Sequence, residues 1–166
     1  MPGPVMIEKA QFLEYDGDSP KTGTAIPVQF NPNTLSVKMK QATAATGAAV
    51  PNLEMGSSLT VDLVFDSTRQ AAEPRDVQEQ ARKLFQLLLP IAGTGTASQR
   101  PKKVGFCWGK FLFIGIVTGF EETLEFFSAD GTPLRSKVKV SMSREDAHWT
   151  AARSQPVTLQ VSSDQD

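Results

Sequence analysis

Hydrophobic and polar side chains alternate along residues 120–142, on both sides of a turn-forming sequence, Ser-Ala-Asp-Gly, at 128–131. Successive residues of a β-strand point to opposite sides of a sheet, so this pattern predicts an antiparallel hairpin with one apolar and one charged face. The apolar positions are Phe120, Leu124, Phe126, Leu134, Val138, Val140 and Met142. The charged face carries Glu121, Thr123, Glu125, Arg135, Lys137, Lys139 and Ser141. Glu122 and Phe127 break the alternation, and we expect both at a strand end or at a subunit boundary.

Similar patterns predict further strand regions, at 5–15, 26–40, 59–65, 102–108 and 111–120. Within the second region the apolar parity changes from even at Phe30 to odd at Leu35. Asn31-Pro32-Asn33 lies at this change, and proline donates no ladder hydrogen bond, so we predict a bulge or kink there. Gly109-Lys110 predicts a tight hairpin turn between the last two regions.

One amphipathic helix is predicted over residues 74–89. Pro74 suits the first turn, Asp76 and Glu79 lie near the positive end of the helix dipole, and Pro90 follows the end. The apolar stripe comprises Val77, Ala81, Leu84, Phe85 and Leu88. We expect the helix to lie on the sheet, and a helix that binds a partner is the alternative.

Two segments lack an apolar period. Residues 41–57 are rich in Ala, Thr and Gly and predict a long loop, and residues 93–101 predict a second flexible connection. Loops longer than about 12–15 residues are uncommon in compact domains and are usually functional or disordered. From residue 146 onward the periodicity fades, so we expect one β domain over 1–145 and a partly irregular C-terminal extension over 146–166.

The composition fits a single mainly β (α+β) domain with one helix. The chain has 166 residues, 17 basic and 18 acidic, and a formal net charge of −1, so nothing draws the whole molecule to nucleic acid or to anionic lipid. The longest apolar run, 111–117, is far shorter than the ~20 residues of a membrane helix. The N-terminus lacks the pattern of a secretory signal, and a single cysteine excludes an intramolecular disulfide. We expect a soluble domain made in the cytoplasm.

No catalytic or metal-binding constellation emerges. His148 is the only histidine, which excludes a histidine metal cluster, and no Gly-x-Ser-x-Gly elbow accompanies it. Cys107 lies in an apolar strand and is predicted to be an inert buried thiol. Asp62 and Asp66 could form a carboxylate pair, but exposed strand positions explain them more simply. Lysines at 102, 103, 137 and 139 could suggest an oligonucleotide-binding face, which the interleaved glutamates oppose. We predict no enzyme and no cofactor.

Several short motifs, in order, resemble the tube-protein family of bacterial contractile injection systems. They are VQFNPNTL at 28–35, LTVDLVFDS at 59–67, DV at 76–77, VGFCWG at 104–109 and FFSADGTPLR at 126–135. More closely, their order is similar to that of the small adaptor that joins the spike hub to the inner tube in the baseplate. Such adaptors often continue into a LysM domain, which the present sequence does not contain.

The resemblance implies two packed antiparallel sheets, often described as a barrel, with one helix alongside and a homohexamer ring around a channel. The implied partners are the spike or hub protein, the inner tube initiator protein and baseplate wedge proteins, in a particle assembled in the bacterial cytoplasm. A subunit of another inner-tube layer and a monomeric β-barrel that binds a small ligand are the alternatives. The expected channel-facing residues are Glu121, Thr123, Glu125, Lys137 and Lys139. The expected contacts between subunits are Gln41, Thr46, Val50, Pro51, Leu53 and Met55.

Overall fold

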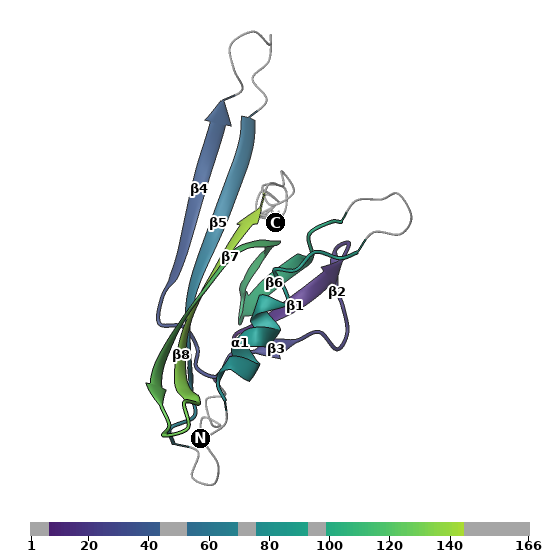
Figure 1. Ribbon diagram of the computed structural model, residues 1–166. Helices are drawn as coiled ribbons and strands as arrows, with labels where there is room; N and C mark the ends of the chain where they lie inside the picture. The colour runs from purple at the N-terminus through teal and green to yellow at the C-terminus, as the bar shows by residue number, and fades with distance from the viewer. Residues whose placement is uncertain (1–6, 44–52, 70–75, 93–98, 145–166) are drawn as a thin grey trace, which may run out of the picture.

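The protein is mainly β with one short helix. The computed structural model describes residues 7–43, 53–69, 76–92 and 99–144 (Figure 1). The strands are β1 Gln11–Asp16, β2 Ser19–Pro20, β3 Ile26–Pro27, β4 Leu35–Thr43, β5 Leu53–Asp66, β6 Lys103–Trp108, β7 Phe111–Phe127 and β8 Pro133–Arg144, and the helix is α1 Gln78–Phe85. They form one antiparallel sheet in the order β2-β1-β6-β7-β8-β5-β4, with β3 paired to β1. Within the described residues this sheet stays open and does not close into a barrel.

Strand β7 connects the two halves of the sheet. Its first part pairs with β6, up to Gly115 opposite Val104, and its second part pairs with β8. Between Val117 and Gly119 the register shifts by one residue, so that Thr118 is an extra residue in β7. A bulge of this kind bends and twists a strand. The predicted strand at 111–120 and the first strand of the predicted hairpin are therefore one bent strand that turns the sheet (Figure 1).

The core lies between the two halves and the helix. Phe12 and Phe106 pack with their ring centroids 5.0 Å apart in one half. From the other half and the helix, the wholly buried or nearly buried side chains are Leu59, Val61, Leu63, Phe65, Val138, Val140, Met142, Val77, Ala81 and Leu84. Each large apolar side chain removed from water in this way contributes about 1.5–3 kcal/mol. The alternation therefore identified the buried face of β5 and β8 correctly.

The helix is shorter than predicted, and its core stripe differs at the end. After Phe85 the chain continues in turns, with the Leu87 N–H bonded to the Leu84 carbonyl at 3.0 Å. This tighter winding brings Leu87, 4% exposed, into the core, whereas Phe85 is 41% exposed. Phe85 packs edge-on against Phe120 of β7, with centroids 5.6 Å apart. The helix thus lies on the sheet, as expected.

The region 26–40 is not one strand with a bulge. Ile26–Pro27 pairs with β1, whereas β4 pairs with β5, and residues 28–34 cross between the two halves. The side chain of Asn31 supports the crossing, since it accepts a hydrogen bond from the Ala10 N–H at 2.9 Å and donates one to the Glu8 carbonyl at 2.8 Å. The parity changes because the chain exchanges one pairing partner for another.

The predicted loop at 41–57 is wrong at both ends. The β4–β5 ladder continues through Gln41 opposite Met55 to Thr43 opposite Leu53, and the two strands extend as a long hairpin beyond the rest of the sheet (Figure 1). Backbone ladder bonds do not depend on an apolar period, so an Ala/Thr/Gly-rich sequence conceals them. Three of the residues predicted for subunit contacts, Thr46, Val50 and Pro51, lie outside the described residues. The first predicted strand also starts later, at Gln11 rather than at residue 5.

Candidate functional site

Charged side chains form rows across one face of β7, β8 and β5. In each row the residues are directly opposed in the two ladders. The rows are Glu121–Lys139–Asp62, Thr123–Lys137–Val64 and Glu125–Arg135–Asp66. We call this surface the charged face. It carries all five residues predicted to face a channel, and it adds the two aspartates of β5.

The charges on this face alternate in sign and pair locally. Lys137 Nζ lies 2.8 Å from Glu125 Oε1, and Arg135 Nε lies 3.8 Å from Glu125 Oε2. Ion pairs at this degree of exposure stabilise a protein by about 0–1 kcal/mol, so they do not explain why the charges are there. Within the described residues, none of the ion pairs involves Glu121. The charged face is therefore hydrated, and acidic and basic side chains alternate from strand to strand across it.

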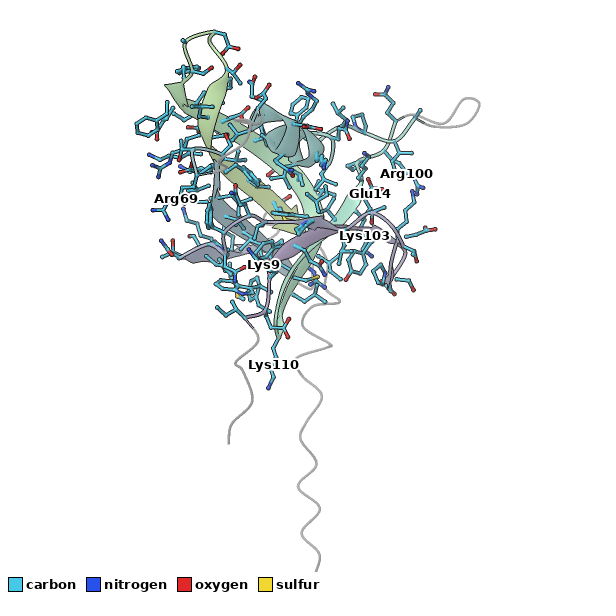
Figure 2. The ribbon with its side chains drawn as sticks, turned by 90° about the horizontal axis from the view of Figure 1, so that it is seen from below. Lys9, Glu14, Arg69, Arg100, Lys103 and Lys110 are labelled. Carbon is cyan, nitrogen blue, oxygen red and sulfur yellow. The ribbon has the colours of Figure 1, made fainter. Side chains whose placement is uncertain are left out.

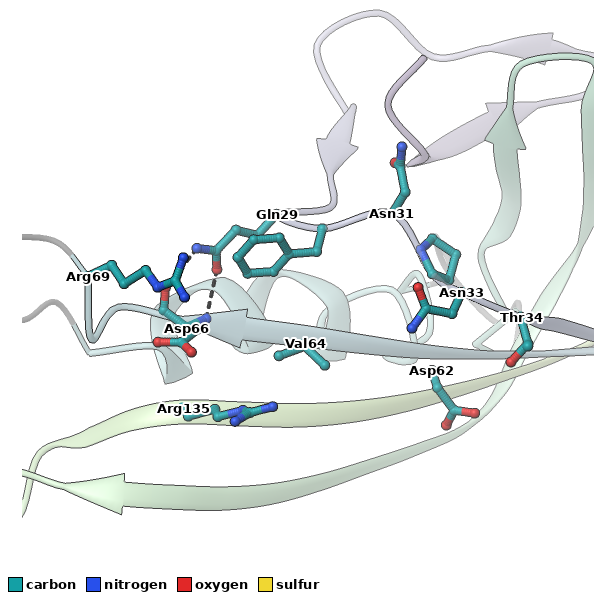
Figure 3. Close-up of a pocket in the computed structure, with 11 residues that line it drawn as sticks. Gln29, Asn31, Asn33, Thr34, Asp62, Val64, Asp66, Arg69 and Arg135 are labelled. Atoms are coloured by element: carbon teal, nitrogen blue, oxygen red, sulfur yellow. Dashed lines mark hydrogen bonds between the residues drawn. The ribbon is translucent and has the colours of Figure 1, made fainter. Parts of the chain in front are cut away.

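Asp66 ends β5 and is held from two directions. Its carboxylate accepts hydrogen bonds from the hydroxyl and the backbone N–H of Thr68, which lower the pKa of Asp66. Its own backbone N–H and carbonyl bond to the side-chain amide of Gln29, at 2.8 and 2.7 Å (Figure 3). Gln29 thus occupies the position that a neighbouring strand would take. Asp62 and Asp66 are two rows apart, with Val64 between them, so they do not form a carboxylate pair.

A groove of about 690 Å³ lies between the crossing segment, residues 28–34, and the end of β5 (Figure 3). It lies next to the start of β4, since the first rung of the β4–β5 ladder is Leu35 opposite Val61. Its lining includes Phe30, Asn33, Thr34, Asp62, Val64, Arg69 and Arg135. The VQFNPNTL motif supplies one wall, but periodicity alone gave no indication of a groove.

The two residues that broke the alternation have different environments. Phe127 is the last residue of β7, as predicted. Glu122, in contrast, lies well inside β7 on the apolar side, where it accepts a hydrogen bond of 2.7 Å from the hydroxyl of the buried Ser136. Glu122 is therefore not at a strand end, and a cross-strand hydroxyl, which the pattern does not reveal, satisfies its carboxylate. The other expectation for Glu122, a subunit boundary, stays a prediction.

Phe126 is not on the apolar face. Its φ of 52° lies in the left-handed region, which interrupts the alternation and leaves the side chain 61% exposed. The Arg135 guanidinium carbon lies 5.9 Å from the centre of its ring. Together with Phe127, 58% exposed, it makes the end of the β7–β8 hairpin aromatic and open to contact.

The half-sheet β7-β8-β5-β4 has two open edges in the described chain. β4 pairs only with β5, and β7 beyond Val117 pairs only with β8. All neighbouring strands are antiparallel, so β4 and β7 also run in opposite directions. Unpaired strand edges present N–H and carbonyl groups that readily pair with another chain.

The lysines at 102 and 103 do not form a basic track. Lys102 lies 3.4 Å from Glu14, and Lys103 lies 3.3 Å from Asp18. Figure 2 shows Lys103 and Glu14 near each other, with Lys9 and Lys110 projecting elsewhere. Alternating acids and bases on this side disfavour a nucleic-acid surface.

Within the described residues the candidate reactive groups do not come together in one site. Cys107 is half-buried in β6, and burial raises the pKa of its thiol, an effect that a hydrogen bond from Tyr15 partly offsets. His148 lies outside the described residues. The described residues contain no group of three or more His, Cys, Asp or Glu side chains placed to hold a metal ion. In the same part of the chain, no helix has the length and apolarity to span a membrane.

Comparison with known proteins agrees with the motif order. A family model described as a contractile injection system tube protein matches residues 6–153. No curated protein matches the chain. The family consists of structural tube proteins, which assemble with copies of themselves and with other tube or baseplate components. Since the match covers the whole of the described sheet, this chain belongs to the contractile injection system tube proteins.

Proposed function

We propose that this chain forms a ring in the baseplate hub of a contractile injection system, in which the half-sheets β7-β8-β5-β4 of successive copies join into a closed wall around a channel. The single observation that carries the proposal is the pair of open edges on that half-sheet. Because β4 and β7 run in opposite directions, rotation of a second copy brings its β7 antiparallel to β4 of the first. A head-to-tail contact of this kind repeats until the ring closes.

Backbone directions along the sheet support this pairing. The Ser67 N–H bonds to the Leu134 carbonyl at 2.9 Å, so odd residues near the end of β5 point their backbone groups towards β8. The directions of the backbone N–H and carbonyl groups alternate along a strand. The backbone groups of Leu59 therefore also point towards β8 and away from Val37, the residue opposite Leu59 in β4. The backbone N–H of Val37 consequently points outward from β4. A neighbouring β7 strand finds its partners there.

The charged face then lines the channel. In a closed ring one side of the half-sheet faces the helix and the core, and the other side faces the lumen. Glu121, Thr123, Glu125, Lys137 and Lys139 lie on the lumen side. A hydrated wall of mixed sign lets a protein cargo pass without a strong attraction to either charge.

The layer between spike and inner tube is the position we propose for the ring. The similarity of motif order to the hub adaptor supports this position over another layer of the inner tube. An adaptor has two different neighbours, the spike or hub protein and the inner tube initiator protein, with baseplate wedge proteins around it. Such particles are assembled in the bacterial cytoplasm.

Ring formation is tested with two variants at one edge residue. Val37→Pro removes the outward N–H, and proline is tolerated at that position of an edge strand, so the fold should persist while rings are lost. Val37→Ala keeps the N–H and should form rings. Native mass spectrometry and negative-stain imaging report the assemblies, and circular dichroism reports the fold. A wild-type protein that stays monomeric alone and with both neighbours contradicts the ring.

The layer is tested by pull-down with each candidate neighbour. An adaptor ring binds the spike protein and the tube initiator separately. A ring that binds only tube proteins belongs to another tube layer, and the hub position is then wrong.

A further inference from the structure

We propose that the aromatic hairpin end of one copy, Phe126 and Phe127, seats in the groove between the crossing segment and β5 of the neighbouring copy. This inference rests on the ring described above and adds a specific contact to it. The occupant is a second copy of this chain, and the central pair of residues is Phe127 with Phe30.

The first support is position along the sheet. Leu35, Val61, Val140 and Phe120 form one row across the four strands. Leu35 is the first residue of β4, so β4 has no residues beyond this row, whereas β7 continues to Phe127. When β7 of one copy lies along β4 of the next with Phe120 level with Leu35, its last residues extend past Leu35, the first residue of β4. The groove begins at this same point.

The second support is the face on which each partner lies. Phe127 lies opposite Pro133 at the end of β7, where the hairpin reaches the end of the charged face. The left-handed backbone at Phe126 turns its ring towards Arg135, which is also on that face. The groove is lined from the same face by Asp62, Val64 and Arg135. Hairpin end and groove are therefore on the same side of the wall.

The third support is chemical complementarity. Phe126 and Phe127 are 61% and 58% exposed at one end of the molecule, and Phe30 at the groove is 50% exposed. Large side chains this exposed gain contact area and lose hydration when they meet. The hairpin end also carries Asp130, whose pKa is lowered by hydrogen bonds from Ser128 and Thr132, so it is anionic at neutral pH. Arg69 of the groove supplies the opposite charge.

The fourth support is an unpaired backbone at the groove floor. The Asp66 N–H and carbonyl face away from β8 and are taken by Gln29. By alternation the backbone groups of Val64 face the same way, beyond the last rung of the β4–β5 ladder, and no described strand pairs with them there. An extended segment from a neighbour can satisfy these groups, as in strand addition to a sheet edge.

Cross-linking between two single-cysteine variants tests the contact. Both carry Cys107→Ser, and one adds Phe30→Cys while the other adds Phe127→Cys. After co-assembly of the full chains and mild oxidation with copper–phenanthroline, a disulfide between the two variants reports a contact between copies only. The matched control replaces Phe127→Cys by Leu112→Cys, another exposed apolar residue of β7, 44% exposed. Since assembly raises the effective concentration of the two thiols, the test pair should cross-link at least about tenfold faster than the control.

The outcomes separate this contact from the ring itself. Rings with a fast Phe30–Phe127 cross-link support the inference. Rings in which the test pair reacts no faster than the control overturn the inference and leave the ring intact. A cross-link found only after rings stack into tubes also overturns it, because the groove then meets another layer. The absence of rings from the wild-type protein overturns the proposed function first.

Discussion

The hydroxyl of Ser136 donates a hydrogen bond of 2.7 Å to the carboxylate of Glu122, its diagonal neighbour in the β7–β8 ladder. Ser136 is wholly buried, so its hydroxyl has no access to water as an alternative partner. Ser136→Ala should therefore lower the free energy of unfolding by about 1–3 kcal/mol, the cost of leaving a carboxylate without its partner. Urea denaturation measures this loss.

Glu122→Gln provides the matched control, because its amide oxygen still accepts the hydrogen bond. It should lose less stability than Ser136→Ala. Equal losses in the two variants mean that charge, rather than the hydrogen bond, holds Glu122 on the apolar side.

Gly115→Ala should destabilise the protein by about 1–3 kcal/mol, the usual effect of overpacking. A Cβ at Gly115 collides with the backbone carbonyl of Ser143, where β7 passes from one half of the sheet to the other. Gly56→Ala is the control, since a Cβ there meets nothing within 4 Å. Thermal unfolding of both variants checks the difference, and a Gly115→Ala protein as stable as Gly56→Ala contradicts the close approach.

Stability should fall as the pH rises from about 8 to 10, because burial raises the pKa of both Tyr15 and Cys107. In that range the unfolded thiol releases its proton before the folded one, so the unfolded state binds fewer protons and is favoured by alkali. The contribution is fully present below the unfolded pKa and is lost as the pH passes through the folded pKa. Cys107→Ala should flatten the slope, as measured by urea unfolding at the two ends of the range. An unchanged slope assigns the effect to Tyr15 alone.

Glu121→Lys should leave the fold and ring formation nearly unchanged, since the side chain is exposed and substitutions at such sites usually stay within about 0.5 kcal/mol. In a channel wall the reversal should change cargo loading, measured as the amount of cargo protein that co-purifies with assembled particles. Glu79→Lys, an exposed residue of α1 away from the charged face, is the control for net charge. If the two variants load cargo equally, Glu121 does not face the cargo.

The parts of the fold that follow local rules could be predicted from the sequence. Alternation located the buried side of β5 and β8, including Leu63 and Val140, because burial and side-chain direction are set by neighbouring residues. Alternation also placed the β7 and β8 residues of the charged face, such as Glu121 and Lys139, on one side of the predicted hairpin. The positive φ of Phe126 and the hydrogen bond that accommodates Glu122 could not be predicted, because neither feature produces a periodic pattern of hydrophobic residues.

Long-range pairing was the other limit. The strand extension through Gln41 and Met55 depends on which backbone lies opposite, not on side-chain polarity. The groove could not be predicted for the same reason, since Phe30 and Val64 line one groove only after the chain crosses between the halves of the sheet. The family motifs indicate the family of the chain, whereas the open edges and the groove depend on how distant parts of the chain pair.

The extra residue at Thr118 has a consequence for how this chain tolerates change. Before it, odd residues of β7 such as Phe113 and Val117 point into the core, and after it even residues such as Phe120 do. Deletion of Thr118 itself would remove the bulge and leave the following residues on their present sides. Deletion of one residue from the paired part that follows, such as Thr123, exchanges the inner and outer sides of everything after it and places Glu125 on the apolar side. Substitutions that keep the alternation are therefore tolerable along the second part of β7, but a change in the number of its residues is not. Sequence variation among functional versions of this strand should consist of substitutions, with insertions and deletions confined to the turns at either end.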